Sequence, residues 1–265
     1  MPSRPLHPSL HDARLPHLGS AIGMIVLYFA LQFVASGLVG VGLGFALGVS
    51  GAPASGMAAR IKTVLAQPDT NALMVILTLL LAASMTIVLV RRLWPAAWSH
   101  GAPPGLGLTG PGRPLFYLAA VLLGLALPIA GGWLTRWIAH GHQVTQDVKQ
   151  IGGAASLALR LPLALVVVSL GPLVEELLFR GALLSALLRR MHAGWAVALS
   201  SLLFAFVHLP DLNFLWYAVP NLALLAAALA WLRLRSGSLW PAVVAHGVNN
   251  LLAVIAWFVA SPGLH

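Results

Sequence analysis

The sequence predicts an all-α protein, a polytopic bundle of transmembrane helices with about seven spans and a cytoplasmic N-terminus. Of its 265 residues, 59% are apolar and only 8% are charged, whereas a soluble domain carries about 25% charged residues. The mean hydropathy of +0.90 agrees with this reading. Seven apolar runs are long enough, or nearly so, to cross about 30 Å of hydrocarbon as helices. They lie near residues 18–48, 72–94, 115–138, 161–188, 195–210, 214–234 and 239–260.

The elements divide into three regions. Residues 1–17 are polar, proline-rich and basic, which predicts a cytoplasmic tail. The run at 18–48 is much longer than the apolar part of a signal peptide, about 7–15 residues, and therefore predicts an uncleaved span. It opens an N-terminal group of transmembrane helices over residues 18–150, and a second group occupies residues 151–265. An eighth span would arise if the 161–188 run broke at Pro172, because proline removes one helix hydrogen bond.

The positive charges predict the orientation. With the N-terminus inside, nine basic residues fall in inner segments and five in outer ones, as the positive-inside rule requires. We therefore expect a multi-pass protein of the cell (plasma or inner) membrane, with membrane lipid as a partner. The net charge of +9 forms no long basic run, so we expect no nucleic-acid partner. The inner residues are Arg4, Arg14, Arg91, Arg92, Arg113, Arg189, Arg190, Arg233 and Arg235, and the outer ones Arg60, Lys62, Arg136, Lys149 and Arg160.

The two glutamates of the chain are adjacent and lie inside an apolar run. An ionisable side chain at the centre of a membrane helix costs about 2.5–3.5 kcal/mol on insertion scales, so it tends to face a polar interior and to have a partner. Arg180 follows Glu176 at the i,i+4 spacing that brings two side chains to one helix face. Glu175 points about 100° away from Glu176 and is less easily paired locally. A purely structural salt bridge would leave Glu175 unexplained.

Two later runs carry further polar side chains. His208 lies in one, and His246 and Asn250 lie one turn apart in the other. Three spans that each contribute polar groups are typical of a site inside a helix bundle. A simple count of residues places Glu175 and His246 roughly 10 Å from the inner face at 1.5 Å per residue. The same count places His208 nearer the other face, unless the 195–210 run forms a shifted or tilted helix.

Such residues could hydrolyse an amide in two ways. A carboxylate and an imidazole can activate a water molecule, while a second imidazole and a side-chain amide donate hydrogen bonds to the oxyanion. Alternatively Glu175, His208 and His246 could ligate zinc, as in a metalloprotease. We favour the scheme without a cofactor, because an amide one turn after a histidine suits an oxyanion donor better than a zinc ligand. The chain has no cysteine, and its sequence contains no HExxH, GxSG or Gly-Asp protease motif.

The ordered motifs resemble one family, the CAAX-protease and bacteriocin-processing (CPBP, or ABI) family of intramembrane proteases. Residues 175–181 (EELLFRG) resemble its EExxxR motif, residues 204–208 (FAFVH) its FxxxH motif and residues 246–250 (HGVNN) its HxxxN motif. The resemblance covers roughly residues 160–255. It implies that residues 151–265 form the catalytic membrane core.

The resemblance implies an intramembrane endopeptidase of the type that removes the last three residues of prenylated CAAX proteins. By analogy Glu175 and His208 activate water, His246 and Asn250 stabilise the oxyanion, and Glu176 and Arg180 form a structural pair. The expected substrate is a membrane-associated peptide or protein. Two alternatives remain, a non-catalytic immunity or scaffold protein of the same fold and a small proton-coupled transporter, because intramembrane carboxylates and histidines also relay protons.

Overall fold

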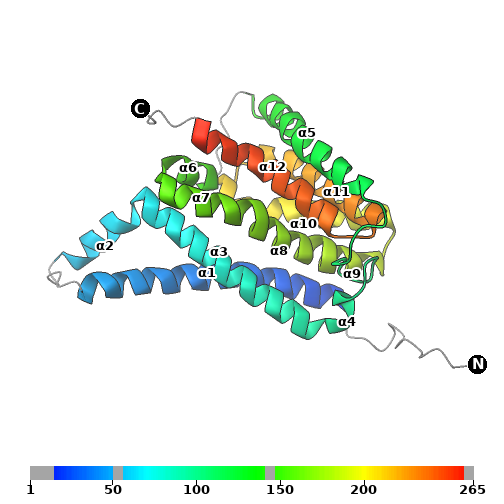
Figure 1. Cartoon of the computed structure of the whole chain (residues 1–265), viewed down its shortest axis with the longest axis horizontal. Helices are drawn as coiled ribbons and strands as arrows, with labels where there is room; N and C mark the ends of the chain where they lie inside the picture. Colours follow the sequence, from blue (N-terminus) through cyan, green and yellow to red (C-terminus); the bar gives the residue numbers. More distant parts are fainter. Residues whose placement is uncertain (1–14, 50–55, 141–146, 260–265) are drawn as a thin grey trace, which may run out of the picture.

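The computed structural model describes residues 15–49, 56–140 and 147–259. It confirms the all-α prediction, because these residues form a bundle of helices and contain no β-strand (Figure 1). Most of the predicted tail, residues 1–14, lies outside the described residues. At its end, the carbonyl of Pro16 accepts a hydrogen bond from the Arg189 guanidinium. This contact ties the start of the first helix to the loop that follows α9.

Among the described residues, six helical segments are long and apolar enough to cross a membrane. Three of them come from the N-terminal half, namely α1 (Leu18–Val49), α3 (Pro68–Leu93) and α5 (Leu115–Ile138). The other three are a composite helix over Leu157–Leu188, the segment Trp216–Ser236, which contains α11 (Val219–Ser236), and α12 (Trp240–Val259). Three short helices lie between the long ones: α2 (Met57–Leu65), α4 (Pro95–Trp98) and α6 (Asp147–Ala154).

The seventh predicted run forms a shorter helix than expected. It becomes α10 (Ala193–Val207), whose 15 residues extend about 22 Å at 1.5 Å per residue. This length falls short of a full crossing of about 30 Å. Two single 3₁₀ turns, η4 (Pro210–Leu212) and η5 (Trp216–Ala218), then connect α10 to α11. Because α10 stops early, the residue at its C-terminal end lies within the bundle.

The eighth span that a break at Pro172 would create is absent from the described residues. The helix instead continues through α7 (Leu157–Leu165), the π-helical segment η2 (Val166–Leu170), α8 (Gly171–Glu176), the π-helical segment η3 (Leu177–Leu183) and α9 (Leu184–Leu188). In η2 the N–H of Gly171 bonds to the carbonyl of Val166, five residues earlier. The wider π turn lets the helix pass the proline without breaking, and such turns are frequent at functional sites.

The seven helical segments, α10 included, run alternately in opposite directions along the bundle. The helices α4 and α9 lie at one end of the bundle, on the right in Figure 1, and α2 and α6 lie at the opposite end. The first end carries Arg91 and Arg92 at the end of α3, and Arg233 and Arg235 in the last turn of α11. We call it the arginine-rich end.

A loop at the arginine-rich end, residues 99–114, sets the start of α12. The buried Arg233 guanidinium donates hydrogen bonds to the carbonyls of Gly101 and Gly105, both at 2.7 Å. The Gly107 carbonyl in turn accepts a hydrogen bond from the Leu239 N–H. At Gly107 (φ +86°), an added Cβ would lie 2.7 Å from the Arg233 Cζ, so a larger residue would push the loop away. The loop therefore fixes the depth at which α12 enters the bundle.

Candidate active site

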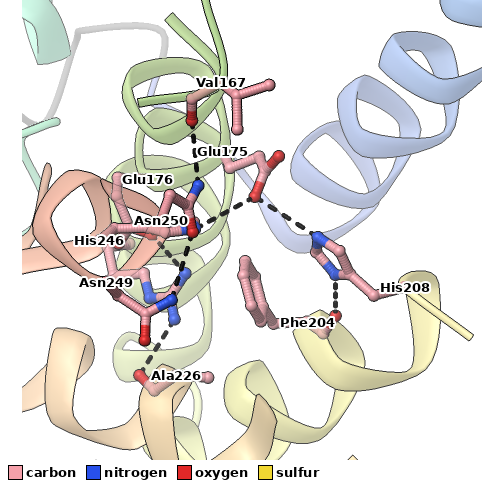
Figure 2. A network of polar contacts seen from close by, with 10 residues as sticks. Val167, Glu175, Glu176, Phe204, His208, Ala226, His246, Asn249 and Asn250 are labelled. Carbon is pink, nitrogen blue, oxygen red and sulfur yellow. Dashed lines mark hydrogen bonds and ion pairs between the residues drawn. The ribbon is translucent and has the colours of Figure 1, made fainter. Parts of the chain in front are cut away.

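Glu175 lies between the two histidines that the sequence singles out (Figure 2). Its Oε2 is 3.5 Å from the Nε2 of His208 and 3.9 Å from the Nε2 of His246. The Glu175 side chain is about one-fifth exposed, so water can reach the carboxylate. At separations near 3.5 Å or more, a single water molecule can bridge the groups. One carboxylate oxygen thus faces two imidazole nitrogens from two other helices.

The short α10 explains why His208 reaches this position. Glu175 precedes the end of α9 by 13 residues, and His208 follows the start of α10 by 15. At 1.5 Å per residue, both lie about 20–22 Å from the arginine-rich end of their helices. The shifted helix that would bring His208 to the same depth is present.

Glu176 connects the predicted ion pair to the catalytic candidates. Its Oε1 accepts hydrogen bonds from the Nη1 of Arg180 and the Nδ1 of His246, each at 2.9 Å. Glu176 and Arg180 are both buried, and Arg180 also donates to the Ala226 carbonyl. The pairing with Arg180 follows from the i,i+4 spacing, but the bond to His246 does not. Glu176 therefore fixes the His246 ring, with its Nε2 on the side of Glu175.

Phe204 packs at the centre of this cluster. Its ring centroid lies 4.5 Å from that of His208 and 5.8 Å from that of His246, and the Arg180 guanidinium carbon lies 4.4 Å from it. The sequence marks Phe204 only as a motif position. In the structure the Phe204 ring separates the Arg180 cation from His208. It also keeps the imidazole rings of His208 and His246 apart, so that each of the two faces Glu175.

The tautomer of His208 follows from its second contact. Its Nδ1 lies 2.7 Å from the carbonyl oxygen of Phe204. A carbonyl only accepts hydrogen bonds, so Nδ1 must carry the proton and donate it. In the neutral ring, the Nε2 that faces Glu175 is therefore a bare acceptor. The Glu175 carboxylate and this Nε2 can together accept one proton, as a base and its partner do.

Asn250 makes contacts that the motif did not predict. Its Nδ2 donates to the carbonyl of Val167 at 3.0 Å, and its Oδ1 accepts from the neighbouring Asn249 at 3.2 Å. In the π register of η2, the N–H that would reach the Val167 carbonyl belongs to Pro172, which has none. The Asn250 amide satisfies this carbonyl in its place. An amide nitrogen carries two N–H groups, so one remains for a ligand.

These residues line one large cavity of about 1030 Å³, which includes Glu175, His208, His246 and Asn250 in its wall. From Glu175 the cavity extends away from the arginine-rich end. Its far part reaches the first turn of α3 at Asn71, the last turn of α5 at Arg136 and the end of α12 at Trp257. All four predicted catalytic side chains therefore border one space that leads to the opposite end of the bundle.

Zinc was the alternative for Glu175, His208 and His246. Within the described residues, no group of three or more histidine, aspartate and glutamate side chains is arranged to hold a metal ion. Each histidine has its Nδ1 committed to a protein oxygen, and only the two Nε2 atoms face the Glu175 carboxylate. A metal-bound histidine usually has its other ring nitrogen on such an oxygen, so these two Nε2 atoms and the carboxylate are the groups that would hold zinc, which stays an alternative prediction.

Together the fold and the site define a polytopic helical membrane protein with a carboxylate–imidazole cluster deep in a water-accessible cavity. Residues 157–252 match the family model of Type II CAAX prenyl endopeptidase, Rce1-like. This match, which covers residues 157–252 of the 265, confirms that this part resembles the CAAX proteases, a family of peptidases. The match includes all three motifs and leaves α1 to α6 outside it. No curated protein and no solved structure matched the chain.

Proposed function

We propose that this chain is an intramembrane endopeptidase of the CAAX-protease type. It resides in the cell membrane and hydrolyses a peptide bond in a membrane-associated peptide or protein. The observation that carries the proposal is the position of Glu175, whose Oε2 faces the Nε2 atoms of His208 and His246 inside the cavity. A carboxylate held beside an imidazole acceptor is the arrangement that general-base activation of water requires.

In the proposed reaction, Glu175 and His208 accept one proton from a water molecule. The resulting hydroxide attacks the carbonyl carbon of the scissile peptide bond and forms a tetrahedral oxyanion. When the C–N bond breaks, the proton held by Glu175 and His208 passes to the leaving amine. The OH group of the water thus ends on the new carboxyl group and its proton on the new amine, and the site returns to its starting state.

The oxyanion is stabilised by two donors. The free N–H of Asn250 is one, because the other N–H holds the amide against Val167 and thereby orients it. His246 is the second: with protons on both ring nitrogens, its Nδ1–H donates to Glu176 and its Nε2–H donates to the oxyanion. Donors fixed before the reaction stabilise developing charge without reorganising during it. Glu176 and Arg180 position His246 and do not touch the substrate.

Comparative membrane proteomics tests this proposal. Strains that carry the wild type, Glu175→Gln or His208→Gln are compared with a His192→Gln control, since His192 caps the opposite end of α10. We expect one or more membrane peptides to be cleaved in the wild type and in His192→Gln, and to remain whole in the other two. If every cleavage survives in Glu175→Gln, the chain is not a protease of this mechanism. A scaffold protein predicts this unchanged cleavage in Glu175→Gln. A proton-coupled transporter predicts unchanged cleavage together with the loss of pH-driven flux in that variant.

A further inference from the structure

Uncharged polar side chains from the N-terminal helices and α11 line part of the cavity, beside apolar residues and the charged Arg136 and Asp211. We call them the polar wall: Gln32 of α1, Asn71 and Thr78 of α3, Thr135 of α5 and Asn221 of α11. Four of the five lie outside the part of the chain that matches the family model, residues 157–252. The wall therefore belongs to a region for which the family comparison assigns no role.

The wall faces the cavity because of helical periodicity. Asn71 and Thr78 are seven residues apart, two turns along one face of α3. Phe29, Gln32 and Ser36 follow the i, i+3, i+7 pattern of one face of α1, and all three line the cavity. On α5, Gly131 makes room for the wall, since an added Cβ would lie 1.7 Å from the Asn221 Oδ1. The polar groups of four helices thus converge on one space.

Two of these groups have unmet hydrogen-bonding capacity. The hydroxyls of Thr78 and Thr135 are buried and have no hydrogen-bond partner among the described residues. A buried polar group without a partner is costly, and more so inside a membrane. Both threonines border the cavity, and rotation about χ1 would let each buried hydroxyl reach what enters it. The wall therefore indicates a polar occupant as well as water.

The chemistry of the wall specifies this occupant. Side-chain amides present donors and acceptors together, which matches the alternating N–H and C=O groups of an extended peptide. A hydrocarbon chain would leave those amides unsatisfied. The charged residues that line the cavity, Arg136 and Asp211, are not part of the polar wall, so a charged ligand would find its opposite charge outside the wall. The cavity, at about 1030 Å³, is at the upper end of the roughly 300–1,000 Å³ typical of ligand clefts.

We propose that the polar wall binds the backbone of the peptide segment that Glu175 cleaves, through its amide N–H and C=O groups. The inference rests on the proposed function and extends it to the substrate-binding groups. The segment is extended and uncharged where it contacts the wall, and its sequence is read only weakly there, because every residue offers the same backbone groups. The N-terminal helices thereby complete the site that the family core begins.

Binding measurements on Glu175→Gln in lipid nanodiscs test this proposal without cleavage. The probe is a fluorescent hexapeptide of alanine and serine, capped at both ends, and binding is followed by anisotropy. Thr78→Val and Asn221→Leu are the wall variants. Thr86→Val is the matched control, because Thr86 is a second buried threonine of α3 whose hydroxyl also lacks a partner among the described residues, yet it does not line the cavity.

We expect each wall variant to weaken peptide binding by about 2- to 12-fold, the worth of one ordinary hydrogen bond, and Thr86→Val to bind as its parent does. Replacing single peptide N–H groups by ester oxygens should weaken binding to the parent and have less effect on the wall variants. Equal binding by wall variants and control would overturn the inference, as would tight binding of a fluorescent fatty acid with no binding of the peptide.

The two proposals fail in different ways. Suppose that the hexapeptide binds the wall, but the wild type cleaves no peptide that stays whole in Glu175→Gln. The proposed function is then wrong, and the binding role remains. If the wild type cleaves its substrate and the wall variants bind and cleave like Thr86→Val, the protease stands and the wall has no part in binding. A wall that only keeps the cavity hydrated would give this second result.

Discussion

Replacing Asn250 by alanine removes two functions at once, and a second substitution separates them. The Asn250 amide donates to the Val167 carbonyl, to which Pro172 has no N–H to donate. The same amide also offers the proposed oxyanion donor. An unsatisfied buried carbonyl costs about 1–3 kcal/mol. Val167 is only half-buried and borders the cavity, so water can compensate in part, and we expect a loss near 1 kcal/mol. Turnover should fall by about 100- to 1,000-fold, the loss typical of one oxyanion donor.

Pro172→Ala supplies the missing backbone N–H. In the Asn250→Ala background it should bond to the Val167 carbonyl and recover about 0.5–1.5 kcal/mol, the net value of an ordinary hydrogen bond, while turnover stays low. Pro172→Ala alone should change stability little, because Asn250 already occupies that carbonyl. The four proteins form a double-mutant cycle.

Stability is measured as the temperature at which half of the detergent-solubilised protein stays monodisperse, and turnover as the cleavage that the proteomic comparison identifies. If Pro172→Ala recovers no stability in the Asn250→Ala background, the π-register explanation of the Val167 contact is wrong. If the double variant regains turnover, Asn250 acts only through the helix and is not an oxyanion donor.

Three further outcomes are expected. Arg180→Ala should lower the yield of folded protein in the membrane, at a cost of about 3–5 kcal/mol for a broken buried pair, whereas Glu175→Gln should accumulate normally; the reverse pattern would exchange the roles of the two glutamates. Gly247→Ala should destabilise the protein by about 1–3 kcal/mol, because the new Cβ would lie 2.6 Å from the Val168 carbonyl oxygen, while Gly23→Ala, with open space around it, serves as the control in thermal unfolding. Purified enzyme should keep its activity in phenanthroline and contain less than one zinc per chain by mass spectrometry; activity restored by zinc alone would require the metal mechanism.

Local patterns in the sequence predicted much of the fold and part of the site. Apolar runs gave the long helices, since length and composition alone decide whether a helix can cross a membrane. The i,i+4 spacing predicted the contact between Glu176 and Arg180, because it places the two side chains one turn apart on the same face of the helix. The order of the motifs indicated that Glu175, His208 and His246 meet.

Contacts between distant segments could not be predicted in this way. The bond from Asn250 to Val167 depends on a π turn that Pro172 helps to create and on the close approach of α12 that Gly247 allows. The depth of His208 depends on where α10 ends, and apolar runs locate helix ends only within a few residues. The polar wall consists of single polar residues scattered over four helices, and no spacing along the chain connects Gln32 with Asn221.

The direction in which the cavity extends decides where the products go. It runs from Glu175 toward the end of the bundle that carries α2 and α6. At the arginine-rich end Arg233 is bonded to the 99–114 loop, and no residue of that loop lines the cavity. If the arginines lie in the cytoplasm, as the positive-inside rule predicts, a released fragment leaves on the far side of the membrane. Such an enzyme would mature or destroy peptides that have already been exported, and a cytoplasmic peptide would have to be translocated before it could be cut.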